Sequence, residues 1–208
     1  MTESETLPMF PLGTVLFPSM LLPLRIFEPR YRAMIRECLA GDRRFGVVLI
    51  ERGSEVGGGD QRSNLGCVAS VVQASERSDG QWLLTAMGTQ RIRVREWLED
   101  DPFPRALVER HHDTTAVHPD AVSFVELVST FRRVLALAAE LDEWSVPFGL
   151  ELAEDPNLAV YQMCAASPLG VFDRQRLLGC DSLACRVEWL ARLLAETEEL
   201  LGQRLAHG

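Results

Sequence analysis

The first strong hydrophobic stretch runs from residue 7 to residue 31, and prolines interrupt it at short intervals. About half of its residues are Leu, Ile, Val, Met or Phe, and five more are Pro. A proline has no backbone N–H to donate and is confined to strand edges and turns. The stretch therefore predicts short extended pieces joined at fixed corners, and neither one long strand nor a helix.

Residues 28–110 carry one helical pattern followed by strand patterns. Apolar residues recur at helical spacing between Pro29 and Gly41, which predicts a helix over 28–40. The later strands are expected over 45–50, 65–77, 81–88, 91–98 and 104–110, with a glycine-rich loop over 53–64. Asp79-Gly80 between two apolar runs indicates a hairpin. No helix is expected between these strands, so the pairing should be mainly antiparallel in a closed or partly closed barrel.

The pattern changes to helical spacing after a polar, proline-containing hinge at 111–118. Four helices are expected, over 119–141, 155–166, 172–178 and from Asp181 or Ser182 onward. The sequence thus predicts an α+β protein with two domains. Residues 1–113 form the β-rich domain and residues 114–208 form a bundle of about four helices.

Composition excludes several function classes. All 21 basic residues are arginine, and a phosphate-binding GxxxxGKS/T loop, a Ser–Lys dyad or a Schiff-base enzyme each needs a lysine. The net charge is −9, with −2 in residues 1–117 and −7 in residues 118–208, which disfavours nucleic acid as a partner. The five scattered cysteines indicate reduced, buried thiols. No signal-peptide pattern and no apolar run of membrane-spanning length occurs, so a cytoplasmic protein is expected.

Four motifs in residues 7–110 occur in the order found in the N-terminal, substrate-binding domain of Lon-type ATP-dependent proteases. LPMFPLGTVLFPSMLLPLRI resembles the proline-punctuated opening of that family, and residues 28–31 follow where the family has its first helix. GCVASVVQ and MGTQRIRV resemble two of its strands. The segment SPLGVFDRQRLLGCDSLACRVEWLARLL is similar to the helical region that follows in the family. The resemblance therefore covers nearly the whole chain.

The resemblance implies a fold and a function. The fold would be a PUA-like pseudo-barrel with one helix packed on it, followed by the helical bundle. The chain ends at Gly208 without the lysine that the ATPase and protease modules need, so we expect a non-enzymatic protein without cofactor or metal. We expect it to bind unfolded or exposed protein segments, as an adaptor or regulator of proteolysis acting with a Lon-type protease. An RNA- or nucleotide-binding PUA-like module is the alternative.

Candidate binding residues come from three places. Phe10, Phe17 and Met20 lie next to prolines at expected corners, where side chains can be exposed, although core packing is the competing interpretation for the apolar stretch. Glu28, Arg30 and Tyr31 begin the first helix, where capping and packing compete with recognition. Arg91, Arg93 and Arg95 alternate along one strand and form an outward row that would bind a carboxylate or phosphate, or pair with nearby glutamates.

Overall fold

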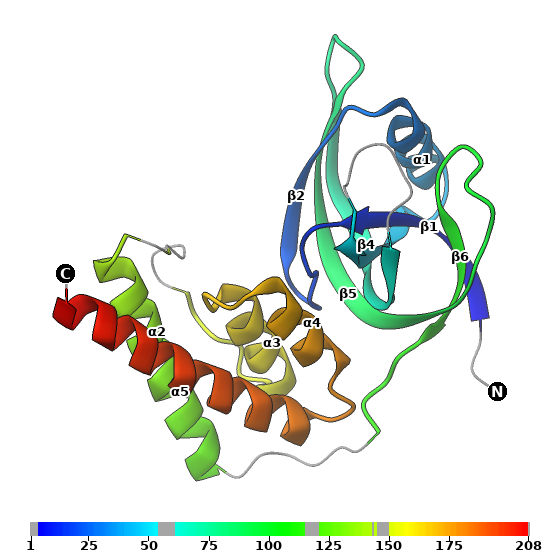
Figure 1. Ribbon diagram of the computed structural model, residues 1–208. Helices are drawn as coiled ribbons and strands as arrows, with labels where there is room; N and C mark the ends of the chain where they lie inside the picture. The colour runs from blue at the N-terminus through cyan, green and yellow to red at the C-terminus, as the bar shows by residue number, and fades with distance from the viewer. Residues whose placement is uncertain (1–3, 54–60, 115–120, 143, 145–149, 208) are drawn as a thin grey trace. The chain divides into compact units, whose positions relative to one another are not determined.

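The computed structural model describes residues 4–53, 61–114, 121–142, 144 and 150–207. The chain divides into two compact units, residues 1–112 and residues 113–208, and each is described by itself (Figure 1). The first unit contains β1 (Ser4–Leu12), β2 (Leu21–Ile26), α1 (Pro29–Ala40), β3 (Arg44–Arg52), β4 (Gln61–Glu76), β5 (Trp82–Trp97) and β6 (Arg105–Arg110). The second contains α2 (Ala121–Glu140), α3 (Pro156–Ala166), α4 (Val171–Gly179) and α5 (Leu183–His207). The α+β class and the helical second half are as predicted.

One six-stranded sheet closes on itself in the first unit. Its strand order is β2-β5-β4-β3-β1-β6, and β6 also pairs with β5. All pairings are antiparallel except β1 with β3. The curved sheet with α1 beside it is visible in Figure 1. The prediction of a mainly antiparallel barrel with one helix is confirmed.

The proline-rich stretch forms two short strands and a corner, as predicted. Pro8 and Pro11 lie in β1, and Pro23 lies in β2. Between the strands, Ser19 takes a positive φ of 65°, and its N–H donates to the Gly88 carbonyl at 2.8 Å. The corner is therefore fixed by backbone contacts to β5.

Two sequence predictions about the strands are wrong. The strands expected over 81–88 and 91–98 are one strand, the 16-residue β5. The loop expected over 53–64 is shorter, because 61–64 belong to β4; residues 54–60 of that loop lie outside the described part of the chain. β5 is long because it pairs with β2 along its first half and with β6 along its second half. β4 is also long, since it pairs with β5 on the other side across this change of partner.

Two buried clusters fill the first unit. The larger lies between α1 and the sheet and includes Phe10, Tyr31, Met34, Ile35 and Phe45. The smaller is formed by residues of β1, β3, β4, β5 and β6, namely Leu7, Met9, Val48, Val68, Ile92, Val94, Ala106 and Val108. Burial of this apolar area drives the folding of the unit.

A buried arginine ties together the second unit. The side chain of Arg186 in α5 has 0% exposure, and its Nη2 lies 2.9 Å from Asp113 Oδ1. It also donates to the carbonyls of Leu177 and Cys180 at 3.3 and 3.2 Å, and it stacks over the Tyr161 ring at 4.4 Å. One guanidinium thus connects α3, the end of α4, α5 and the segment before α2. Among the described helices, none is long and apolar enough to cross a membrane.

Gly88 is predicted to be required for barrel stability. A Cβ at this position would overlap the carbonyl oxygen of Phe17, which is backbone and cannot rotate away. Gly88→Ala should lower the free energy of unfolding by roughly 1–3 kcal/mol, measured by urea denaturation. The control is Gly202→Ala in α5, where a Cβ meets nothing within 4 Å; it should be neutral or stabilising by up to about 1 kcal/mol. Equal stability of the two variants would contradict the close approach.

Loss of the Arg186 charge is predicted to destabilise the helical unit. Arg186→Met keeps most of the side-chain volume but leaves the Asp113 carboxylate, 23% exposed, without this guanidinium. The expected loss is roughly 3–5 kcal/mol in the unfolding free energy followed by circular dichroism. The control is Arg192→Met, which removes an exposed pair with Glu196 in α5 and should cost less than about 1 kcal/mol. Similar losses in both variants would contradict the central role of Arg186.

Candidate functional site

Large apolar side chains gather on the outer face of β2, β4 and β5. Leu21 and Val72 are each 58% exposed, and Phe27, Leu83 and Met87 are exposed as well. We call these five residues the β2–β5 apolar face. Contiguous exposed apolar residues on a folded unit mark surfaces that bind something apolar.

Strand alternation explains why these residues face outward. Leu22 and Ile26 point into the core, so Leu21 and Phe27, at odd spacing from them, point out. Across the strand pair, Leu21 lies opposite Met87, and Arg25 lies opposite Leu83. Cross-strand neighbours of this kind lie close enough to form one continuous surface.

A β-bulge adds Val72 to this face. Val71 pairs with Ala86 and Gln73 pairs with Thr85, so Val72 is the extra residue in β4. Both Val72 and Gln73 are exposed, whereas Val71 is buried. The bulge therefore replaces strict alternation with two successive outward side chains.

A shallow hollow lies on the same face. Its volume is about 470 Å³, and it is lined by Pro23, Leu24, Arg25, Gln73, Ser75, Leu83, Leu84 and Thr85. Arg25 Nε donates to Gln81 Oε1 at 2.8 Å. The hollow thus combines an apolar floor with a polar rim that includes one positioned guanidinium, which suits a side chain or a short extended segment of a ligand.

The buried thiols and the metal-ligating residue types were the candidates for reactive groups in the described part of the chain. Burial raises the pKa of the thiols of Cys38, Cys67 and Cys164 to about 12, so none of these is a thiolate nucleophile near neutral pH. Within the described part of the chain, no group of His, Cys, Asp or Glu is arranged to hold a metal ion. The chemistry offered by the β2–β5 apolar face is burial of apolar area and hydrogen bonding.

The exposure expected for Phe10 and Phe17 is wrong. Phe10 is buried against Tyr31 and Phe45, with ring centroids 4.3 and 6.1 Å away. Phe17 is fully buried because the backbone of the corner that carries it packs closely against β5 at Gly88. Met20 is partly buried and packs against the larger core cluster. Proline corners here hold aromatic side chains inside the unit rather than presenting them to solvent.

Glu28, Arg30 and Tyr31 lie together at the start of α1. Glu28 Oε2 pairs with Arg30 Nε at 3.0 Å, and the Arg30 guanidinium stacks over the Tyr31 ring at 4.5 Å. Tyr31 itself is buried and belongs to the core. The three side chains lie together, as the sequence suggests, but their charged and aromatic groups contact one another.

The arginine row on β5 is only partly exposed. Arg91 is buried, so the expectation that it points outward is wrong; it lies where β5 begins to pair with β6 while still paired with β4. Arg93 is half-buried, and Arg95 is exposed and pairs with Glu109 Oε2 at 2.7 Å. A row of three outward guanidinium groups does not form.

Sequence reasoning missed the five residues of the β2–β5 apolar face. In LLPLRIF the set Leu22, Leu24 and Ile26 is wholly apolar, whereas the opposite set contains Arg25, so alternation indicates which set is buried but not that the outer set forms an apolar surface. The same is true of WLLTAM in β5. The signal that could have found them is a large apolar residue on the outer set beside a polar one: Leu21 and Phe27 flank Arg25, and Leu83 and Met87 flank Thr85.

Thiol reactivity is predicted to follow burial. Because Cys38, Cys67 and Cys164 are buried with raised pKa values, they should resist a disulfide exchange reagent at pH 8 in the folded protein. The half-buried Cys185 should be the first to react, and all five thiols should react after unfolding in urea. Cys185→Ser is the control and should remove the early reaction. Rapid reaction of several thiols in the native protein would contradict the prediction.

Three comparisons with known proteins agree on one family. The family model of the ATP-dependent protease La (LON) substrate-binding domain matches residues 6–196. The Lon protease of Cytophaga hutchinsonii is 26% identical over 205 residues, which cover 95% of this chain and 25% of that protein. A LON peptidase N-terminal domain and RING finger protein of Schizosaccharomyces pombe is 31% identical over 124 residues, covering 54% of this chain and 25% of that protein.

Solved structures show the same fold. The Lon N-terminal domain protein from Xanthomonas campestris superposes with a TM-score of 0.67 at 24% identity, covering 89% of this chain and 96% of that chain. The N-terminal domain of Mycobacterium avium complex Lon protease gives a TM-score of 0.63 at 17% identity, covering 92% and 98%. The chain spans about a quarter of the length of the curated relatives it matches. With its family model matched over most of its length, this chain belongs to the LON substrate-binding domain family.

Proposed function

We propose that this protein binds exposed apolar segments of other polypeptides on its β2–β5 apolar face. The observation that carries this proposal is the cluster of five large apolar side chains exposed over three adjacent strands, beside a hollow of about 470 Å³. Membership in the LON substrate-binding domain family supports it.

Binding would be driven by removing apolar area from water. Each Å² of apolar surface buried contributes about 25 cal/mol before the costs of ordering are subtracted. Met87 adds a flexible, polarizable side chain that fits different partners, which favours recognition of many sequences. The guanidinium of Arg25 on the rim can donate to a main-chain carbonyl or a carboxylate of the ligand.

The outer edge of β2 favours side-chain contacts over strand addition. The Gly88 N–H donates to the Met20 carbonyl, which makes Leu21 and Met87 a non-hydrogen-bonded pair. The backbone groups of Leu21, Pro23 and Arg25 therefore point away from β5. Pro23 has no N–H at its position, so an incoming strand would meet an incomplete row of donors.

A role in proteolysis is the wider context that we propose. The relatives matched over nearly the whole of this chain are Lon proteases, in which the matched region makes up about a quarter of the length. A module that holds apolar segments would serve such a machine as an adaptor or regulator, by raising the local concentration of unfolded protein near a protease.

Nucleic-acid binding has weaker support than it had from the sequence. The row of arginines on β5 was its main feature, and Arg91 is buried while Arg95 is neutralised by Glu109. The net charge of −9 also repels phosphate.

A permanently unfolded, fluorescently labelled model protein tests the proposal. Leu21→Ser and Met87→Ser together should weaken its binding at least about tenfold in fluorescence anisotropy, because both remove apolar area from the face. The matched control is Leu200→Ser, which removes a side chain of α5 that is 60% exposed and should leave the affinity unchanged.

Two outcomes would contradict the proposal. One is that the unaltered protein does not bind the unfolded model protein above background. The other is binding that is the same in the double variant and the control. Affinity should also change little with added salt, whereas a steep fall with salt is the signature of polyanion binding.

A further inference from the structure

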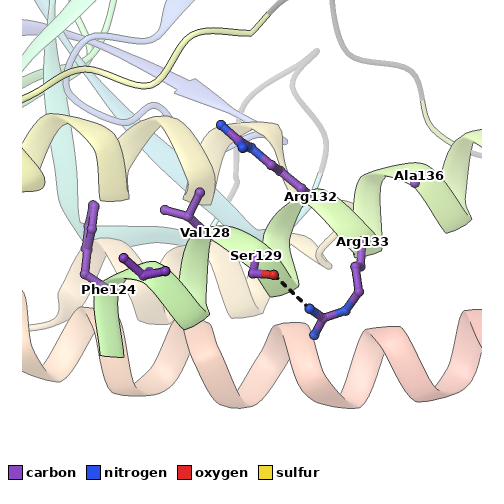
Figure 2. A pocket seen from close by; sticks show the side chains of 7 residues that line it. Phe124, Val128, Ser129, Arg132, Arg133 and Ala136 are labelled. Carbon is purple, nitrogen blue, oxygen red and sulfur yellow. Dashed lines mark hydrogen bonds between the residues drawn. The ribbon is translucent and has the colours of Figure 1, made fainter. Parts of the chain in front are cut away.

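Helix α2 has one apolar face packed against α5 and a second that, among the described residues, is partly exposed. Leu127, Phe131, Val134 and Ala138 are buried on the side that packs against α5. The neighbouring face carries a shallow groove of about 520 Å³ lined by Phe124, Val125, Val128, Ser129, Arg132, Arg133 and Ala136 (Figure 2). Val125 is 68% exposed, which is high for a helical valine of a folded unit. We call this surface the α2 groove.

The α2 groove is long enough for another helix. Phe124, Val128, Arg132 and Ala136 are spaced four residues apart, so they form one row along the helix. At about 1.5 Å per residue the row extends roughly 18 Å, which matches three to four turns of a second helix. Helices pack by inserting rows of this kind into one another.

The two arginines of the groove differ in their availability. Arg133 pairs with Glu198 of α5 and donates to Ser129, so its charge is already satisfied. Figure 2 shows Arg133 pointing toward α5 and Arg132 pointing to the opposite side, with Phe124 and Val128. Arg132 is exposed, and within the described part of the chain no carboxylate pairs with it. The groove is thus apolar at one end and positive at the other.

The charge distribution of the α2 groove indicates which kind of helix fits it. Residues 118–208 carry a net charge of −7, so a positive end on an apolar groove departs from its surroundings. A second copy packed over the full length of the same row would place the two Arg132 side chains level with each other when the helices are parallel, and about 6 Å apart along the axis when they are antiparallel. Two like charges at that distance repel, so self-association on this face is disfavoured.

We propose that the α2 groove docks an amphipathic helix of a partner protein. That helix has apolar residues facing Phe124, Val125 and Val128, and a carboxylate one to two turns away that pairs with Arg132. The apolar contacts supply most of the affinity, and the ion pair fixes the direction of the helix in the groove. The surface belongs to the helical unit and does not depend on the β2–β5 apolar face.

Synthetic peptides test the charge selection directly. The probe is a fluorescein-labelled amphipathic helix of about 20 residues, with leucines on one face and glutamates in its last turns; a matched peptide has lysine in place of each glutamate. Fluorescence anisotropy with the full 208-residue chain should show the glutamate peptide binding up to about fivefold more tightly. Arg132→Glu should reverse the preference, and Val125→Asp should weaken both peptides.

Control variants separate this site from other surfaces. Arg192→Glu reverses an exposed charge on α5 and should leave peptide binding unchanged. Leu21→Ser removes part of the β2–β5 apolar face and should leave the preference for the glutamate peptide over the lysine peptide unchanged, so failure of either proposal is recognised separately. Circular dichroism should show that Val125→Asp, at an exposed position, keeps the helical content.

Three results would overturn the proposal. Equal affinity for the glutamate and lysine peptides would remove the role of Arg132. Affinities of the Arg132→Glu variant for both peptides that equal those of the unaltered protein would also remove the role of Arg132. Concentration-dependent dimerisation in analytical ultracentrifugation that is lost in Val125→Asp would identify the groove as a contact between copies of this chain.

Discussion

The pairing of β6 along both of its edges is the constraint on which the β-rich unit depends. β6 pairs with β1 from Ser4↔Glu109 to Pro8↔Arg105, and with β5 from Ile92↔Arg110 to Trp97↔Ala106. This double pairing closes the sheet, and Ala106 and Val108 of β6 belong to the smaller buried cluster. Leu22, Ile26, Leu84 and Ala86 of β2 and β5 belong to the larger cluster against α1, so residues in the opposite alternation of these strands lie outside and form the β2–β5 apolar face.

The sequence predicts the type and order of the elements because those depend on local signals. Asp79-Gly80 indicates the hairpin between β4 and β5, and the Asp155 side chain caps α3 at the Leu158 N–H as Asp-Pro suggests. The continuity of β5 depends on a tertiary contact instead. Gly88 looks like a break in the strand pattern, yet it is an unbroken strand position at which the Phe17 backbone passes too close for any side chain.

The side of the strand that is buried also depends on tertiary contacts. Arg25 already marks the outer side of β2, but it is the register against β5, Leu21↔Met87, that brings apolar side chains of two strands together on that side. Phe10 and Phe17 were expected outside because they lie next to prolines, and both lie inside. The stretch 7–31 singled out from the sequence contains Leu21 and Phe27 of the candidate site, but Val72, Leu83 and Met87 come from β4 and β5 and could not be chosen from it.

Arginine has several structural roles in a chain that lacks lysine. Arg186 is fully buried in a hydrogen-bonded network, and the guanidinium groups of Arg176 and Arg192 lie 4.3 and 5.4 Å from the centroid of the Trp189 ring. A planar, weakly hydrated guanidinium suits these positions better than an ammonium group does. The number of basic residues therefore overstates the positive charge available to a ligand. Arg132 in the α2 groove differs from these arginines, because no carboxylate among the described residues pairs with it.

An exposed apolar face is a hazard as well as a binding surface, since two such faces can associate. The same strand that presents Leu21 carries Pro23 at an outward backbone position, which removes a donor from the open edge. The net charge of −9 adds long-range repulsion between copies, which is weakened by salt while the apolar contact with a ligand is not. Together these features let a side-chain surface remain open to an apolar segment of another protein while strand pairing and self-association are opposed.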